Sequence, residues 1–516
     1  MPPSDAWDAI VVGAGVGGCV VAAGLAAAGR QVLLLEAGPG DPRPASVIGL
    51  DTIAAAEEPS RQWPDLRVRS SDPGFDAPGS STASSDRPYR QGFGVGGGSL
   101  INSLLLTPGD SHDYRRWQQQ FGCDRWGPDD MAVFLESAAT AFGGLPHDVG
   151  PVSEAFAAAA SAAGHQEGGS SLDQDRLGIL GSRLAVRSGG RRSVVEAYLG
   201  PQHGFVSEDG GGLAVRGDSA VRRVTMAGHG VTGVEFGDGH QERAPLVIVS
   251  AGAIRSPLLL SDSGLTHPAI GQGLKDHPSF AFTIALNRDE VDETYDPASG
   301  ARAISRLLRW SSDDSEHGDL QAFVVDRVDT SPDGRGSADG DSGPLAVVIV
   351  GLMRVTASGW VAPTAAESGA RATGPTVVTG ALSTASDRER LRSGVLHILD
   401  LLRSAELSSL VREIYLDDRG TTADALSGMD PSAIDRFLAE HPGPYAHPAG
   451  TCAMGPEGHP GSVVSCQPET AGQVIDTDGL YVADASIMPD LVQGGLQVPV
   501  AAIAERVAAG ILALRS

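Results

Sequence analysis

The sequence predicts an α/β protein that opens with a βαβ unit and continues into a region rich in strands. Residues 8–12 form a short β-branched run, a glycine-rich stretch follows, and an alanine-rich helix extends to about Ala28. Residues 31–35 repeat the pattern of a buried strand, which completes a unit of the usual βαβ size. With 516 residues, the chain is long enough for two or three domains.

The glycine-rich turn of this unit is typical of dinucleotide binding. It contains Gly13, Gly15, Gly17 and Gly18, and Glu36 closes the second strand. Glycines there permit a tight turn, let the backbone approach a pyrophosphate, and place a helix N-terminus before the phosphates. Glu36 at this distance is suited to accept hydrogen bonds from ribose hydroxyls. The alternative is a glycine-rich turn without a ligand, and the motif does not distinguish FAD from NAD.

Elements further along the chain are predicted from periodicity and turn signals. Residues 40–90 read as a long loop and 113–165 as helical. Short strands are expected over 213–250, and helices over 386–440 and at the C-terminus near Val498–Leu514. Further strand candidates are Phe280–Leu286, Leu320–Val325, Leu345–Val350 and Thr376–Leu382, with a low-complexity loop at Thr330–Gly343.

A second glycine-rich loop spans Arg90 to Ser103 and reads RQGFGVGGGSLINS. So many glycines suit a backbone that lies against a large planar or phosphorylated ligand. The alternative is a flexible loop, although the glycines lead directly into an apolar segment.

The composition limits the classes of binding partner that the sequence predicts. The formal charge of −26 disfavours nucleic acid and anionic membranes, which are polyanions, and it also fits a solvated acidic surface. The four cysteines show no metal-ligand or disulfide spacing, so no metal site is expected. The N-terminus lacks the basic region of a signal peptide, and no apolar stretch is a convincing membrane span. We therefore expect a cytoplasmic protein.

Five motifs in order resemble the glucose–methanol–choline (GMC) family of flavoprotein oxidoreductases. The first two are the glycine-rich loops, the second followed by Gly109, Asp113-Tyr114 and Trp117. The third is SAGAIRSP at 250–257, followed by a Gly-Gln-Gly segment and Asp276-His277-Pro278. The fourth is HPAGTCAMG at 447–455 and the fifth is GLYVADASIMP at 479–489.

The resemblance implies an FAD cofactor and a two-part architecture. A Rossmann-like FAD-binding domain would comprise 1–45, 86–115, 186–280 and 441–516. A discontinuous substrate-binding domain, an antiparallel sheet covered by helices, would comprise 116–185 and 281–440, with 46–85 as a long loop or lid. Ile101 occupies the place where some members carry a flavin-linking histidine, so the resemblance implies non-covalent FAD. The implied cofactor-binding residues are Gly13, Gly15, Gly17, Gly18, Glu36, Ala37, Arg90, Val95, Gly96, Gly97, Ser99, Asn102, Val221, Ala251, Asp484 and Ala485.

Two of these roles are more specific. Asp484 would hold the ribityl or pyrophosphate region, and the helix starting near Gln497 would direct its positive end to the flavin ring. Val221 lies at the position where backbone groups of family members bind the adenine. The alternative is that Val221 is an ordinary strand valine without a role in binding.

The resemblance also implies oxidation of an alcohol with His447 as acid/base, since a neutral imidazole suits removal of a hydroxyl proton at pH 7. His277 is interpreted as structural. The family's second catalytic Asn or His corresponds to Gly495, so Gln497, Gln493 or a water would supply the missing hydrogen bond. The alternative functions are a hydroxynitrile-lyase-like enzyme that keeps FAD without redox chemistry, and a flavin-binding protein without catalysis. The substrate and the electron acceptor, whether oxygen or a small-molecule or protein acceptor, are not predicted.

Overall fold

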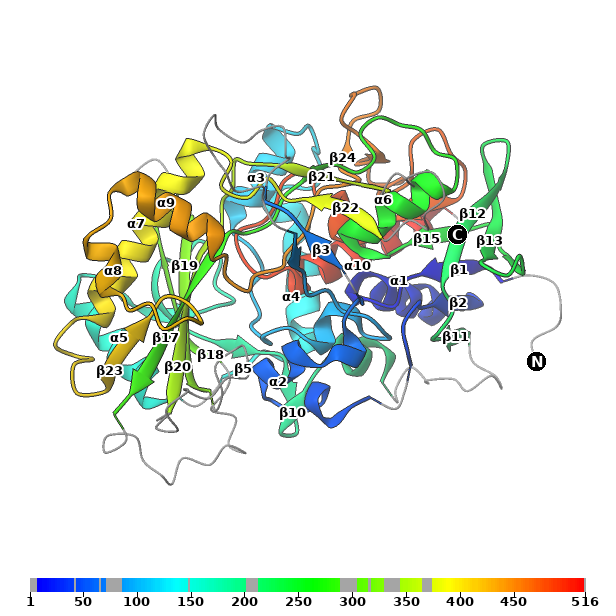
Figure 1. Ribbon diagram of the computed structural model, residues 1–516. Helices are drawn as coiled ribbons and strands as arrows, with labels where there is room; N and C mark the ends of the chain where they lie inside the picture. Colours follow the sequence, from blue (N-terminus) through cyan, green and yellow to red (C-terminus); the bar gives the residue numbers. More distant parts are fainter. Residues whose placement is uncertain are drawn as a thin grey trace.

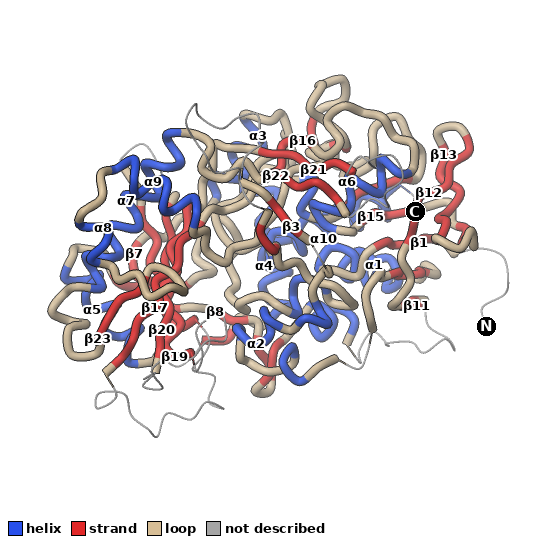
Figure 2. Tube along the Cα trace, viewed as in Figure 1, coloured by secondary structure: helices blue, strands red, loops and turns tan. Residues whose placement is uncertain are grey.

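The computed structural model describes residues 7–40, 43–64, 66–70, 86–146, 149–200, 212–287, 304–313, 317–328, 344–363 and 374–514. The chain forms two lobes, each built on its own sheet (Figure 1). Segments far apart in the sequence meet in the middle, where β3 (Arg67–Val68) lies near β22 (Pro375–Val378) (Figure 2). The predicted loop at 330–343 lies outside the described residues.

The first lobe is built on a five-stranded parallel sheet in the order β11-β2-β1-β15-β26. Its strands are β1 (Ala9–Val12), β2 (Val32–Leu35), β11 (Leu213–Arg216), β15 (Val247–Val249) and β26 (Leu480–Val482). The central strands are apolar along their whole length because helices cover both faces of a parallel sheet. The helices of this lobe are α1 (Val16–Ala27), α6 (Gly252–Asp262) and α10 (Gln497–Leu514), and α10 packs against α1. The predicted α/β fold with its N-terminal βαβ unit is confirmed.

The second lobe is a seven-stranded sheet in the order β23-β17-β20-β19-β18-β7-β6. Its strands are antiparallel except for the pair β6 and β7. They are β6 (Glu167–Ser170), β7 (Gly178–Gly181), β17 (Ser279–Leu286), β18 (Ile304–Trp310), β19 (Leu320–Val328), β20 (Leu345–Leu352) and β23 (Val411–Tyr415). Helices α5 (Pro151–Ala162) and α7 (Ala385–Leu402) cover one face, and α9 (Pro431–Glu440) packs on α7 (Figure 1).

Strand β19 shows how this sheet presents different residues to its two sides. Successive side chains point to opposite faces, so Leu320 contributes to the core on the α7 side. Gln321 and Phe323 point the other way and line a cavity between the lobes.

Three segments differ from the sequence prediction. Residues 411–415 form an edge strand inside the region expected to be helical, because they pair with β17. Within the predicted loop at 46–85, the described part contains the short helix α2 (Thr52–Glu57), capped by Asp51. Helix α4 (Pro128–Phe142) falls in the range predicted for the substrate domain but packs against α10 of the first lobe. The remaining predicted domain boundaries stay predictions.

The remaining elements are short or peripheral. Helix α3 spans Ser111–Gln119, α8 spans Asp424–Ser427, and 3₁₀ turns cover Ala45–Val47, Pro59–Arg61, Gly97–Leu100 and Ala485–Ile487. A π-helical turn covers Val195–Leu199. The short strands are β4 (Arg87–Pro88), β5 (Leu145–Pro146), β8 (Arg183–Leu184), β9 (Val186–Arg187), β10 (Gly190–Arg191), β12 (Val221–Ala227), β13 (Gly230–Phe236), β14 (Gln241–Arg243), β16 (Gln272–Leu274), β21 (Gly359–Pro363), β24 (Met454–Gly455) and β25 (Val464–Ser465).

Among the described residues, α10 alone has the length and apolar composition of a membrane span. Most of it is buried against α1 and α4, which accounts for its apolar sequence.

Candidate active site

A cavity of about 700 Å³ begins at the carboxyl ends of β1 and β2 and extends between the lobes. One end is lined by Glu36, Ala37 and residues 219–222. The other end is lined by Gln321, Phe323 and the segment 445–448. Ligands of open α/β sheets bind outside the carboxyl ends of the strands, so the cavity lies where a dinucleotide is expected.

The glycines of the first motif divide into packing residues and one ligand-facing residue. A Cβ on Gly17 would lie 2.0 Å from the Ala483 carbonyl oxygen, and one on Gly18 would lie 1.8 Å from that of Gly13. Gly13 has φ +101° and is equally crowded, with Ser250 O at 2.4 Å from a built Cβ. Gly15 lines the cavity and would have no atom within 4 Å of a Cβ. Gly15 is therefore the glycine that keeps space open for a ligand.

Two buried carboxylates border the cavity and are held by backbone amides. Glu36 accepts from the N–H groups of Ala14 (2.9 Å) and Gly38 (2.9 Å). Asp484 accepts from Gly252 N at 2.8 Å and from Ser256 Oγ at 2.5 Å. Both also line the cavity, as do Ala251 and Ala485. Their predicted places beside a dinucleotide are consistent with this geometry.

The second glycine-rich loop reaches the cavity with only some of its predicted residues. Gly97, Ser99 and Asn102 line it, whereas Arg90, Val95 and Gly96 do not. Arg90 is exposed and lies 3.7 Å from Glu57. The prediction for these three is corrected. Gln91 and Gly92 do line the cavity, but the backbone N–H groups of Val95 and Gly96 donate to Pro39 O and Ala14 O. Val221 lines the cavity as predicted.

His447 stands at the cavity end nearest the antiparallel sheet, and three contacts hold its backbone and its ring. Its backbone N–H donates to Asp276 Oδ1 at 2.7 Å. The Tyr445 ring stacks on it with centroids 5.1 Å apart, and its Nδ1 lies 3.0 Å from His277 Nδ1. Burial lowers the pKa of His447 to about 4, so the imidazole is neutral at pH 7. A neutral, fixed imidazole in a cavity is the group required of a general base.

Gln497, the first residue of α10, presents a hydrogen-bond donor at the same end. The Arg191 guanidinium only donates, and it contacts Asn102 Oδ1 at 2.7 Å. Asn102 therefore turns its Nδ2 to Gln497 and donates to Gln497 Oε1. Gln497 Nε2 is buried and has no hydrogen-bonding partner among the described residues. An unpartnered buried N–H donor beside a cavity points to a ligand acceptor.

Gln493, the other predicted candidate, does not reach the cavity. Its side-chain amide donates to His317 O at 2.9 Å, and its backbone N–H donates to Asp113 Oδ2 at 2.7 Å. The prediction of a catalytic role for Gln493 is therefore corrected. Gly495 lines the cavity, and its N–H donates to Thr107 Oγ1 at 2.6 Å.

Several residues at the cavity escaped the sequence reasoning. Trp63 comes from the predicted loop region, and the Arg255 guanidinium lies 4.0 Å from its ring centroid. Phe323 and Tyr445 form an aromatic wall, with ring centroids 5.8 Å apart. Only Tyr445 carried a sequence signal, because it stands two residues before His447.

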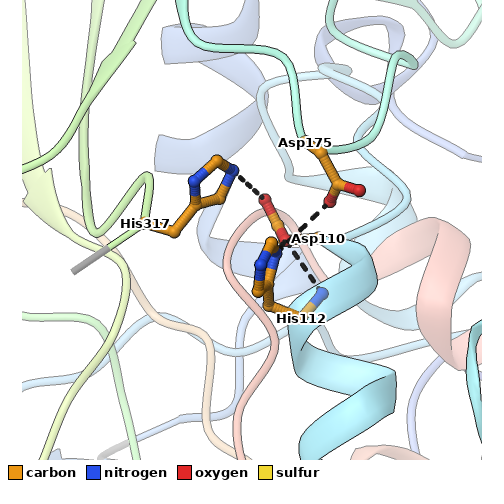
Figure 3. A group of neighbouring side chains, drawn as sticks. All are labelled: Asp110, His112, Asp175 and His317. Carbon is orange, nitrogen blue, oxygen red and sulfur yellow. Dashed lines mark hydrogen bonds and ion pairs between the residues drawn. The ribbon is translucent and has the colours of Figure 1, made fainter. Parts of the chain in front are cut away.

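A cluster of possible metal ligands lies at the N-terminus of α3, where His112, Asp175 and His317 surround Asp110 (Figure 3). Asp110 Oδ1 accepts from His112, and Oδ2 lies 3.2 Å from Arg309 Nη2. Both Asp175 oxygens accept from Ser111. These contacts hold both carboxylates within the protein's own hydrogen bonds and an ion pair. That the chain holds no metal stays a prediction.

A parallel sheet with a cavity at the carboxyl ends of its strands and a glycine-rich first turn is the arrangement of a dinucleotide-binding protein. Comparison with known families specifies which kind. Models described as GMC oxidoreductase match residues 7–279 and 366–504, more than half of the chain. The chain belongs to the GMC oxidoreductase family, and it is an FAD-dependent flavoprotein oxidoreductase. The resemblance seen in the sequence is confirmed.

Individual relatives match nearly the whole of this chain. Pyridoxine 4-oxidase of Microbacterium luteolum is 26% identical, with 98% of this chain and 99% of the relative covered. The mitochondrial choline dehydrogenase of Mus musculus is 28% identical, covering 98% and 89%. The crystal structure of pyridoxine 4-oxidase from Mesorbium loti superposes with a TM-score of 0.79 at 24% identity, covering 98% and 99%.

Proposed function

We propose that this flavoprotein oxidises a primary or secondary alcohol to an aldehyde or ketone, with His447 as the base. The observation that carries the proposal is a neutral histidine fixed at the far end of the cavity from the dinucleotide motif. The relatives named for pyridoxine and choline support a CH–OH donor.

The residues present fit FAD. Gly15 leaves open space where the pyrophosphate approaches a helix N-terminus, and Glu36 borders the expected ribose position. At the other end, Gln497 on the first turn of α10 offers a buried donor that has no hydrogen-bonding partner in the described part of the chain. Ile101 packs with Val47, Ala55 and Leu100, away from the cavity lining, so we propose that FAD binds without a covalent link there.

The bound FAD supplies the acceptor for the hydride that leaves the alcohol carbon. The chain's own residues handle the proton. His447 takes the hydroxyl proton on Nε2, since its Nδ1 faces His277. Tyr445 accepts a 3.2 Å hydrogen bond from Gln321 and, by stacking on His447, keeps the plane of the imidazole fixed. Gln497 Nε2 orients the developing alkoxide or the cofactor.

The described lining beside His447 favours an uncharged substrate. It includes Leu105, Gln321, Phe323, Tyr445 and Leu496, and none of these side chains is a carboxylate that could balance a cation. Gly495 also lines the cavity, and a Cβ there would lie 3.3 Å from Thr107 Oγ1. We propose a neutral alcohol with a flat, largely apolar body.

The test is anaerobic addition of a panel of alcohols to the purified yellow protein, followed by reoxidation with oxygen or with an artificial dye. Bleaching by neutral aryl alcohols, and less by choline, supports the proposal, and the reoxidation rates identify the class of acceptor. An enzyme that no alcohol bleaches is not an alcohol oxidoreductase. Cleavage of cyanohydrins without bleaching would replace the proposal with lyase chemistry.

A further inference from the structure

His277 lies directly behind the base. It belongs to the segment between β16 and β17, 170 residues before His447 in the sequence, and only 2% of its surface is exposed. The two rings meet edge to face, with an interplanar angle of 88° and centroids 5.3 Å apart. Their Nδ1 atoms are 3.0 Å apart, within hydrogen-bonding distance.

The backbone determines which nitrogen of His277 carries the proton. His277 Nε2 lies 3.1 Å from the carbonyl oxygen of Val492, in the segment leading to Gly495. A carbonyl oxygen only accepts, so Nε2 must be protonated to make this hydrogen bond. Burial, followed by the neighbouring His447, holds the pKa of His277 well below its usual range, so the ring carries a single proton. Its Nδ1 is then a lone pair directed at His447.

This orientation fixes the proton on His447 in turn. An acceptor at 3.0 Å requires His447 Nδ1 to be the donor. The neutral His447 imidazole also carries one proton, so its Nε2 is left with the lone pair. A ring with the opposite tautomer would put two lone pairs against each other and remove the base.

We propose that His277 is a positioning residue that locks His447 in the Nδ1–H tautomer, through the chain Val492 O, His277 and His447. The inference rests on the proposed function, since the locked tautomer matters only if Nε2 accepts a proton. In that step the hydroxyl proton moves to His447 Nε2, the hydride leaves the alcohol carbon for the cofactor, and the carbonyl product forms. The proton on Nδ1 stays in place, and His277 receives none.

Asp276 aligns the two partners. Its Oδ1 accepts from the backbone N–H groups of His277 (2.8 Å) and His447 (2.7 Å). Its Oδ2 accepts from the Tyr89 hydroxyl at 2.5 Å. One buried carboxylate therefore joins the two backbone segments that carry the histidines.

The direct test reads the tautomer without any turnover. The holoenzyme is labelled with ¹⁵N-histidine, and the His447 signals are assigned by their loss in His447→Gln. We expect Nδ1 protonated and Nε2 unprotonated in His447, with the reverse in His277. A His447 protonated on Nε2 would overturn the proposal. Because this measurement needs no substrate, it remains decisive even if no alcohol proves to be oxidised.

The kinetic test compares His277→Leu with His277→Asn. Leucine removes the acceptor and leaves a buried N–H unpaired, so anaerobic flavin reduction should slow roughly tenfold to a hundredfold at unchanged FAD content. Asparagine can place an acceptor near the Nδ1 position and should recover most of the rate. Parent rates in the leucine variant would refute the proposal, as would equal defects in both variants with a normal His447 tautomer. If the leucine variant does not fold, the ¹⁵N measurement on the unsubstituted enzyme decides.

Discussion

Two glycines of the same motif should respond to substitution in opposite ways. Gly15 has φ −76° and ψ −166°, which suit any residue, and a Cβ there would have no atom within 4 Å. Gly15→Val should therefore leave the apoprotein folded and act only on the ligand. Overpacking costs about 1–3 kcal/mol, which corresponds to a loss of about 5- to 150-fold in FAD affinity. Gly17→Ala should instead lower the melting temperature of the apoprotein, because its methyl group would lie 2.0 Å from Ala483 O.

The assay is titration of apoprotein with FAD, followed by flavin fluorescence quenching, together with thermal melts in the absence of FAD. Gly237→Val serves as a control, since Gly237 is exposed and also has no atom within 4 Å of a Cβ. A Gly15→Val protein that binds FAD with the parent Kd would refute the placement of the pyrophosphate. A Gly17→Ala apoprotein as stable as the parent would refute the packing argument.

Three further predictions follow from the site. Acid precipitation should release FAD into the supernatant, because Ile101 has no nucleophile, and flavin retained in the pellet would contradict this. Gln497→Ala should slow anaerobic flavin reduction clearly more than Gln493→Ala, because only Gln497 lines the cavity; equal rates in the two variants would exclude the role of Gln497. The rate of flavin reduction should be nearly constant from pH 8 to about pH 5 and fall as the pH approaches the His447 pKa of about 4, because protonation then removes the base. A fall between pH 7 and 6 would show a base with an ordinary pKa.

The parts of the fold and site that the sequence predicted are those set by local backbone requirements. Gly13, Gly17 and Gly18 have crowded surroundings that only glycine fits, so the motif predicts the turn, the helix and the sheet together. The acid/base role of His447 was predicted because the motif at 447–455 resembles one whose histidine has that role in the GMC family. Edge strand 411–415 was missed because its pairing with β17 is a long-range contact that local propensity does not record.

Side-chain roles that depend on distant partners could not be predicted. The sequence favours Gln497 over Gln493 only because Gln497 lies where the chain enters the final helix. The fold turns Gln493 toward His317 and Gln497 toward Asn102. His277 was interpreted as structural because a lone histidine usually is, and its contact with His447, 170 residues away, is not visible in the sequence. Its role depends on the position of a single backbone carbonyl, which no sequence pattern encodes.

The proposed oxidation depends on His447 removing the alcohol's proton as the hydride leaves. It is tested most directly by anaerobic stopped-flow reduction of the flavin in His447→Ala, with exposed His459→Ala as the matched control. His447→Ala should retain FAD and slow reduction by roughly a hundredfold to ten-thousandfold, the usual contribution of a positioned general base. His459→Ala should reduce its flavin at the parent rate. Reduction at the parent rate in His447→Ala would show that His447 does not remove the proton.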